Sequence, residues 1–188
     1  MTPVEATSAV EPATRPASPF RVVFHWLRDL TLSVIIAVMI ILFLYQPVKV
    51  EGTSMMPALV DQERIFINKF VYHAEPIDRG DLVVFWYPRD PSKSYIKRVI
   101  GLPGDTVSID RGTVIVNGTP LKETYVPSQY EDQQSMSPMV VQAGDYFVLG
   151  DHRSASSDSR AWGTVPRRDI YGKAVFVYWP LDKLGVLK

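Results

Sequence analysis

The chain of 188 residues contains no cysteine. This absence excludes a disulfide framework, a thiolate zinc site and a cysteine nucleophile. An excess of either charge is also missing, since 20 Lys and Arg residues balance 20 Asp and Glu residues. Proteins that bind nucleic acid usually carry a net basic charge or a basic stripe, and neither is present. We therefore expect no nucleic-acid partner.

Large apolar residues are almost absent from residues 1–19, which are rich in Pro, Ala, Thr and Ser. Such a segment cannot bury enough surface to offset the entropy lost on ordering. Residues 1–19 are therefore predicted to form a disordered tail.

An apolar run comes next, and no residue from Leu30 to Tyr45 is charged. With its flanks it covers residues 20–46, a length that can cross a bilayer once. A buried core helix is disfavoured because the run is apolar on all faces. A cleaved signal peptide has a similar pattern, but the following sequence QPVKVEG lacks a small-x-small cleavage site. We expect an uncleaved signal-anchor helix.

The basic residues around this run predict its orientation. Arg15, Arg21 and Arg28 precede or begin it, and only Lys49 follows closely. The positive-inside bias therefore puts the N-terminus in the cytoplasm and the remainder outside the membrane.

Residues 47–188 have the pattern of a β domain. Short runs rich in Val, Ile, Phe and Tyr are separated by Gly, Pro and Asp, namely RIFINKFVY, DLVVFWY, YIKRVIGL, TVSIDRGTVIVNG, DYFVLGD and KAVFVYWP. No strand–helix alternation is visible, so a parallel sheet is disfavoured. We expect a mostly β, antiparallel and partly closed sheet, with residues 122–144 as a polar surface excursion.

The stretch VEGTSMMPAL, residues 50–59, contains a candidate nucleophile, Ser54. A serine hydroxyl needs a base. His25 lies on the cytoplasmic side of the expected anchor, and His73 lies in an expected loop after a strand. His152 follows an aspartate, so a Ser54–His152–Asp triad is conceivable, although adjacent Asp and His side chains diverge.

Lysine is the other candidate base. Lys97 lies in the apolar run SYIKRVIGL, and strand alternation puts it on one face with Tyr95 and Val99. Burial there would favour the neutral amine. A lysine on an exposed strand edge, where charge discourages aggregation, fits the pattern equally well.

Four motifs in order behind the apolar run carry a family resemblance: GTSMMPAL, RGDLVVF, YIKRVIGLPGD and GDHRSASSDSRAWG. From about residue 30 onward the chain resembles bacterial signal peptidase I, a membrane-bound Ser/Lys peptidase that removes signal peptides from exported preproteins. The resemblance implies Ser54 as nucleophile and Lys97 as general base, with an acyl-enzyme intermediate and no metal or cofactor. It also implies an inner-membrane location, with lipid around the anchor and the catalytic domain on the extracytoplasmic face.

The resemblance also assigns supporting roles. Ser156, with Ser157 as a possible alternative one residue on, matches a serine that holds the lysine amine by a hydrogen bond. Asp158 and Arg160 match an ion pair that braces the site, and Asp151 and Arg153 resemble further scaffold. The oxyanion hole would use the Ser54 N–H; Gly52 stands where some members have a second donor, a serine.

Signal peptides carry small residues at the first and third positions before the cut, so shallow apolar pockets are expected. The resemblance places Val48, Val50, Met55, Leu59, Tyr95 and Ile96 in them. An extended substrate would add as a strand beside VKVEG or SYIK. Some of Phe85, Trp86, Trp162 and Trp179 are expected to be exposed and to rest on lipid.

Two other functions fit parts of the sequence. A non-catalytic, membrane-anchored β module that binds extended peptides would need neither Ser54 nor Lys97. A self-cleaving Ser/Lys repressor would need a helix-turn-helix ahead of its catalytic part, where this chain has the apolar run.

Overall fold

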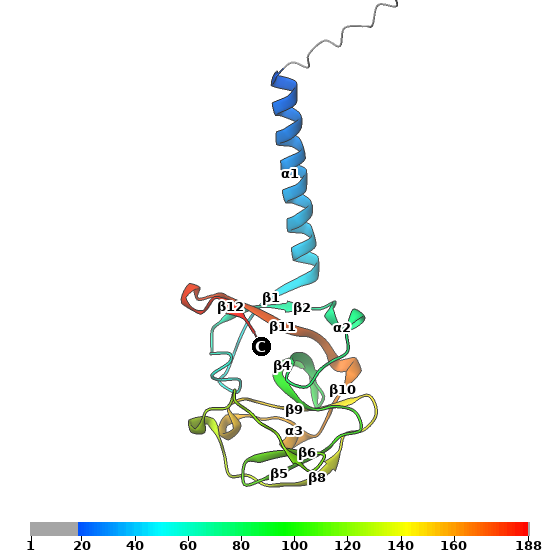
Figure 1. Ribbon diagram of the computed structural model, residues 1–188, viewed down its shortest axis with the longest axis vertical. Helices are drawn as coiled ribbons and strands as arrows, with labels where there is room; N and C mark the ends of the chain where they lie inside the picture. The colour runs from blue at the N-terminus through cyan, green and yellow to red at the C-terminus, as the bar shows by residue number, and fades with distance from the viewer. Residues whose placement is uncertain (1–18, 188) are drawn as a thin grey trace, which may run out of the picture. The chain divides into compact units, whose positions relative to one another are not determined.

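The computed structural model describes residues 19–187 and begins with one long helix, α1 (Pro19–Leu44), drawn in blue in Figure 1. Within it, Val23–Ile41 is long and apolar enough to cross a membrane, with a mean hydropathy of 1.7, and none of that stretch is buried. The helix ends three residues before Pro47, whose ring disfavours helical conformation at Gln46. The expected tail lies outside the described residues except for Pro19, which is already helical.

Residues 42–188 form a second compact unit, and its larger sheet has eight antiparallel strands. In spatial order they are β1 (Tyr45–Lys49), β2 (Arg64–Asn68), β11 (Ile170–Trp179), β3 (Leu82–Tyr87), β4 (Asp90–Gly101), β9 (Asp145–Leu149) and β10 (Val165–Pro166), with β12 (Gly185–Val186) also paired to β11. The unit begins within the expected anchor segment 20–46, because β1 already contains Tyr45 and Gln46.

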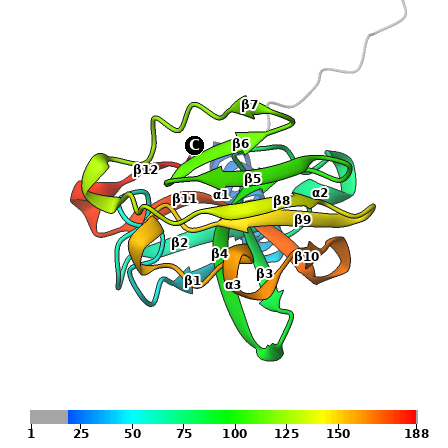
Figure 2. The same ribbon diagram turned by 90° about the horizontal axis from the view of Figure 1, so that it is seen from below.

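A smaller sheet contains β7 (Thr119–Pro120), β6 (Thr113–Val116), β5 (Thr106–Asp110) and β8 (Met136–Val140), in that order. Figure 2 shows it beside β9. The β5–β6 hairpin turns at Arg111 and Gly112, both with positive φ as a tight two-residue turn requires. Strand β8 lies within the expected surface excursion, residues 122–144, where few strand signals were present; it contains Pro138, which an edge strand tolerates.

Short helices connect the strands: α2 (Val71–Ala74), α3 (Ser159–Trp162), and the 3-10 turns η1 (Ser128–Tyr130), η2 (Arg153–Ala155), η3 (Arg167–Asp169) and η4 (Leu181–Lys183). His73 therefore lies in α2 and not in a loop.

The mostly β, antiparallel class is confirmed. Hydrogen-bonded pairing does not close the larger sheet, because among the described strands its order ends at β1 on one side and β10 on the other. This corrects the expected partial closure. One edge of β1 therefore remains without a neighbouring strand in the residues that are described.

Of the four aromatic residues considered for contact with lipid, two are buried and two are exposed. Phe85 and Trp162 lie in one buried cluster, with ring centroids 5.9 Å apart. Trp86 and Trp179 are exposed by 43% and 50%. Phe85 and Trp86 are neighbours on β3, so strand alternation sends one side chain inward and the other outward.

Candidate active site

Ser54 lies in the turn between β1 and β2, and the core fixes this turn. Met55 and Leu59 are buried in one cluster, and the Leu59 N–H donates to the Met55 carbonyl at 2.9 Å. Gly52 has φ of +95°, a conformation that L side chains rarely adopt, and its N–H donates to Asp61 Oδ1 at 2.8 Å. Leu59 is fully buried and does not line the cavity described below, which corrects its expected place in a substrate pocket.

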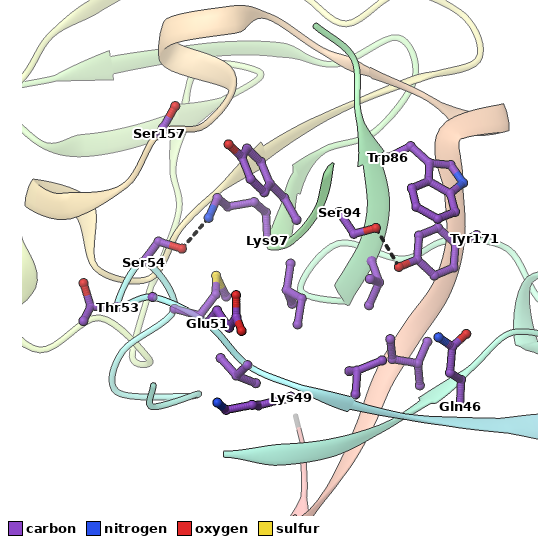
Figure 3. Close-up of a pocket in the computed structure, with 18 of the residues that line it drawn as sticks. Gln46, Lys49, Glu51, Thr53, Ser54, Trp86, Ser94, Lys97, Ser157 and Tyr171 are labelled. Carbon is purple, nitrogen blue, oxygen red and sulfur yellow. Dashed lines mark hydrogen bonds between the residues drawn. The ribbon is translucent and has the colours of Figure 1, made fainter. Parts of the chain in front are cut away.

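Lys97 comes from the middle of β4, where it pairs with Val83 of β3. The lysine is only 4% exposed, so the edge-strand alternative is wrong. Its Nζ lies 2.5 Å from Ser54 Oγ, within hydrogen-bonding distance, as Figure 3 shows. Nζ also lies over the Tyr95 ring, 5.6 Å from its centroid.

The electrostatic surroundings favour a neutral amine at this position. Burial, the largest cause, lowers the pKa of Lys97, and the Arg160 guanidinium also lowers it, while Asp158 and Asp151 raise it; together they bring the pKa from 10.5 to about 8. At that pKa the protonated form still predominates at pH 7, but the neutral form is far more populated than in an ordinary lysine. A neutral amine has a lone pair that can accept the hydroxyl proton of Ser54.

The catalytic loop, defined here as residues 150–160, packs against the Ser54 backbone. The N–H of His152 donates to the Ser54 carbonyl at 3.1 Å. A Cβ on Gly150 would lie 2.2 Å from Ser156 Oγ and 2.5 Å from the Ser54 carbonyl oxygen, so the approach of the loop requires glycine there. This contact places Ser156 beside Ser54.

Ser156 Oγ is buried and has no hydrogen-bond partner among residues 19–187. The expected hydrogen bond to the Lys97 amine is therefore not made in this structure, in which the amine contacts Ser54. Ser157 is exposed and lines the cavity (Figure 3). The role of Ser156 stays a prediction.

Two ion pairs stabilise the catalytic loop. One joins two residues of the loop, and the other joins the loop to β4. Arg160 donates from Nε to Asp158 Oδ1 and from a terminal nitrogen to Oδ2, both at 2.8 Å, which is the pairing that the resemblance implied. Asp151 accepts from Arg98 of β4 at 2.9 and 2.7 Å, and the carboxylate is fully buried. Bidentate arginine–carboxylate geometry fixes orientation as well as distance.

Glu123 and Asp132 are two further residues of this network that sequence reasoning missed. Both lie in the expected excursion, and they pair with Arg153 and Arg160 of the catalytic loop. Each carboxylate is about 30 positions from its arginine, at sequence separations of 30 and 28. No local pattern links residues so far apart, so only the tertiary structure reveals these pairs.

The conceivable histidine triad is not formed. His152 Nδ1 lies 3.2 Å from the Thr53 carbonyl oxygen, and its ring packs edge-on against Tyr130. The adjacent Asp151 is bound to Arg98.

A cavity of about 580 Å³ begins at Ser54 and Lys97 and runs between β1 and β4. Five of the six expected pocket residues line it: Val48, Val50, Met55, Tyr95 and Ile96. Its other end is lined by Gln46, Trp86, Ser94 and Tyr171, where the Tyr171 hydroxyl donates to Ser94 Oγ at 3.1 Å (Figure 3). The cavity is large enough to hold several residues of an extended peptide.

A serine hydroxyl beside a buried amine, at the wall of an apolar cleft, is the arrangement of a hydrolase with a serine nucleophile. Comparison with known proteins shows the family. A family model described as signal peptidase, peptidase S26, matches residues 23–179, and the chain belongs to this family of serine peptidases, whose members cleave signal peptides.

Two signal peptidase sequences agree with that assignment. The chain is 37% identical to a signal peptidase I of Leptolyngbya laminosa, over 98% of this chain and 94% of that protein. It is also 37% identical to a signal peptidase I P of Bacillus subtilis subsp. natto, over 88% and 94% of the two chains. A crystal structure of a signal peptidase I from Enterococcus faecalis V583 is 33% identical and covers 53% of this chain and 97% of its own, with a TM-score of 0.47.

Proposed function

We propose that this chain cleaves N-terminal signal peptides from exported preproteins after a small-x-small sequence, with Ser54 as nucleophile and Lys97 as general base. The observation that carries the proposal is the 2.5 Å contact between Ser54 Oγ and Lys97 Nζ at the wall of an apolar cavity. Desolvation supplies the neutral amine that the chemistry needs.

In the acylation step, neutral Lys97 takes the hydroxyl proton as Ser54 Oγ attacks the scissile carbonyl carbon. The tetrahedral intermediate collapses when the Lys97 ammonium gives that proton to the leaving amine, and the mature protein departs. The signal peptide stays bound as an ester on Ser54. Lys97, neutral again, then takes a proton from water as the water oxygen attacks the ester carbonyl carbon. The bond from that carbon to Ser54 Oγ breaks, Lys97 returns the proton to Oγ, and the signal peptide leaves with a free carboxyl group.

The developing oxyanion needs hydrogen-bond donors. The backbone N–H of Ser54 donates to no other group within residues 19–187 and is available for this role. Gly52 carries no side-chain donor, and its own N–H is already bound to Asp61. The proposed oxyanion hole therefore relies on the Ser54 N–H and not on Gly52.

The substrate is proposed to bind as an extended strand between β1 and residues 94–97 of β4. The outer edge of β1 is unpaired in the described strands, so its backbone groups can bond to a substrate of any sequence. Successive substrate side chains then alternate, and the first and third before the cut face the cavity. Val48, Val50, Met55 and Ile96 narrow that end of the cavity, which favours alanine-sized groups there.

Cleavage of a preprotein by the purified full-length chain in detergent tests this function. Alanine at the last position before the cut is expected to support turnover, and phenylalanine there to decrease kcat/KM by on the order of 100-fold, because the cavity wall excludes it. The matched control places phenylalanine one residue earlier, where the side chain points away from the cavity; it is expected to be tolerated. Equal cleavage of all three substrates would contradict the proposed pocket.

We further propose that α1 anchors the chain in the inner membrane, with the tail 1–19 in the cytoplasm and the catalytic domain, residues 47–188, outside. Because the chain lacks cysteine, single cysteines report topology without background. In intact spheroplasts an impermeant maleimide is expected to label Ser128→Cys, an exposed position, and to label Ser8→Cys only after lysis. The reverse pattern would contradict this orientation.

A further inference from the structure

The excursion between β7 and β9 provides two largely buried carboxylates to the catalytic loop. Glu123 accepts from both terminal nitrogens of Arg153, at 2.7 and 2.6 Å. The side chains of Arg153 and Glu123 are 4% and 11% exposed. Solvent therefore screens this ion pair little.

Asp132 makes the second connection. Its carboxylate accepts from Arg160, and both side chains are 9% exposed. Arg160 also donates to the Arg153 carbonyl at 2.8 Å and binds Asp158 through two nitrogens. Arg160 is thus bonded to the Arg153 backbone and to Asp158 as well as to the excursion.

From these arginines the network reaches the nucleophile in two steps. Arg153 Nε donates to the Gly150 carbonyl at 3.0 Å, and the Gly150 N–H donates to Asp158 at 3.1 Å. Gly150 packs directly against the Ser54 carbonyl and Ser156. A displacement of either arginine would therefore move the loop surface on which Ser54 rests.

The smaller sheet fixes the excursion at Asp132. The turn residue Gly112 donates its N–H to the Gln134 carbonyl at 2.8 Å, and Arg111 donates its N–H to Ser135 Oγ at 2.9 Å. A Cβ on Gly112 would lie 2.2 Å from the Asp132 carbonyl oxygen. The β5–β6 turn thus holds the Asp132 backbone closely, so the carboxylate is presented from a fixed support.

We infer that Glu123 and Asp132 are positioning residues for the Ser54 and Lys97 reaction, acting through Arg153 and Arg160 to hold the catalytic loop against the nucleophile. Neither carboxylate lines the cavity that contains Ser54 and Lys97, so neither is a catalytic residue. The inference assigns a function to the smaller sheet: it supports the excursion that clamps the loop. It rests on the proposed function, since it concerns the efficiency of that same site.

Kinetics of Glu123→Gln and Asp132→Asn in the full-length chain test the inference. Each variant leaves a guanidinium buried with one charge partner fewer, which loosens the loop. We expect kcat to fall about tenfold, while KM changes less than twofold because the substrate strands are not touched. Glu131→Gln is the matched control, since Glu131 is an exposed neighbour in the same segment, and it is expected to keep wild-type kcat.

The pH profile separates positioning from simple loss of fold. A loosened loop admits water to Lys97, so the midpoint of the kcat/KM profile is expected to rise by half a pH unit or more in both variants. A decrease in kcat that matches the decrease in folded fraction, with an unchanged midpoint, would show a structural role alone and overturn the inference. Wild-type kcat in both variants would overturn it as well.

Charge-retaining variants keep the test available if the neutral ones do not fold. Glu123→Asp and Asp132→Glu preserve the ion pairs but alter their lengths, so the same decrease in kcat is expected at a near-native unfolding temperature. A different result would show that the proposed function itself is wrong: Ser54→Ala would cleave the preprotein as well as wild type does. If Ser54→Ala is inactive and all four carboxylate variants are fully active, the inference alone fails.

Discussion

Lys97→Met is expected to abolish preprotein cleavage, decreasing kcat by a factor on the order of 10⁴, while the protein stays folded. Methionine has a similar length and fills the buried site at Lys97, but it has no lone pair able to accept the Ser54 proton. Ser54→Ala is expected to cause a loss of the same order. The double variant is expected to be no less active than either single variant, because the two groups act in one step.

His152→Ala is the matched control for this prediction. His152 lies beside Ser54 in space, since its N–H donates to the Ser54 carbonyl, yet its ring nitrogen faces the Thr53 carbonyl. The control is expected to retain activity within a few-fold of wild type. Full cleavage by Lys97→Met would refute the Ser54–Lys97 pair, and a loss confined to His152→Ala would support the triad. A peptide-binding module would retain peptide binding in every variant and cleave in none, wild type included.

The strands were predictable because their signals are local. Runs of β-branched and aromatic residues between turn residues correspond to β2, β3, β4, β5, β6, β9 and β11. Strand β8 was not predictable from its own residues, since MSPMV contains Pro, Ser and few β-formers. Its pairing with β5 is a tertiary contact that overrides weak local propensity.

The site was predictable only in part, for a similar reason. Alternation placed Lys97 with Tyr95 but left open whether that face is buried; the pairing with Val83, itself fully buried, decides it. Ser54 and Lys97 are 43 positions apart, and only the family resemblance connected them before their contact was known. The resemblance placed Leu59 in the substrate pocket, whereas the turn directs its side chain into the core.

The pH dependence follows from the buried position of Lys97. The kcat/KM for preprotein cleavage is expected to increase about tenfold per pH unit below about 8 and to level off above it, because only neutral Lys97 accepts the Ser54 proton. At pH 6 the expected rate is therefore on the order of 100-fold below the plateau.

Stability is expected to change with pH in the same direction as activity, and both increase as Lys97 loses its proton. The pKa of Lys97 is lower in the folded chain than the usual 10.5, so between about 8 and 10.5 the unfolded chain binds more protons. The contribution of Lys97 to the free energy of unfolding is a penalty that is fully present below pH 8 and disappears as the pH rises to 10.5. That penalty is roughly 3 kcal/mol at most. Lys97→Met is expected to remove it, so the difference in unfolding free energy between variant and wild type narrows with rising pH.

Initial rates from pH 5 to 9 at constant ionic strength measure the profile, and circular dichroism at each pH confirms that the chain remains folded. The midpoint distinguishes the candidate bases. A lysine lowered by burial gives a midpoint near 8, an exposed lysine would give one above 10, and a histidine base would give one near 6.5. His152→Ala is expected to leave the midpoint unchanged. A midpoint near 6.5 that disappears in His152→Ala would transfer the role of base from Lys97 to His152.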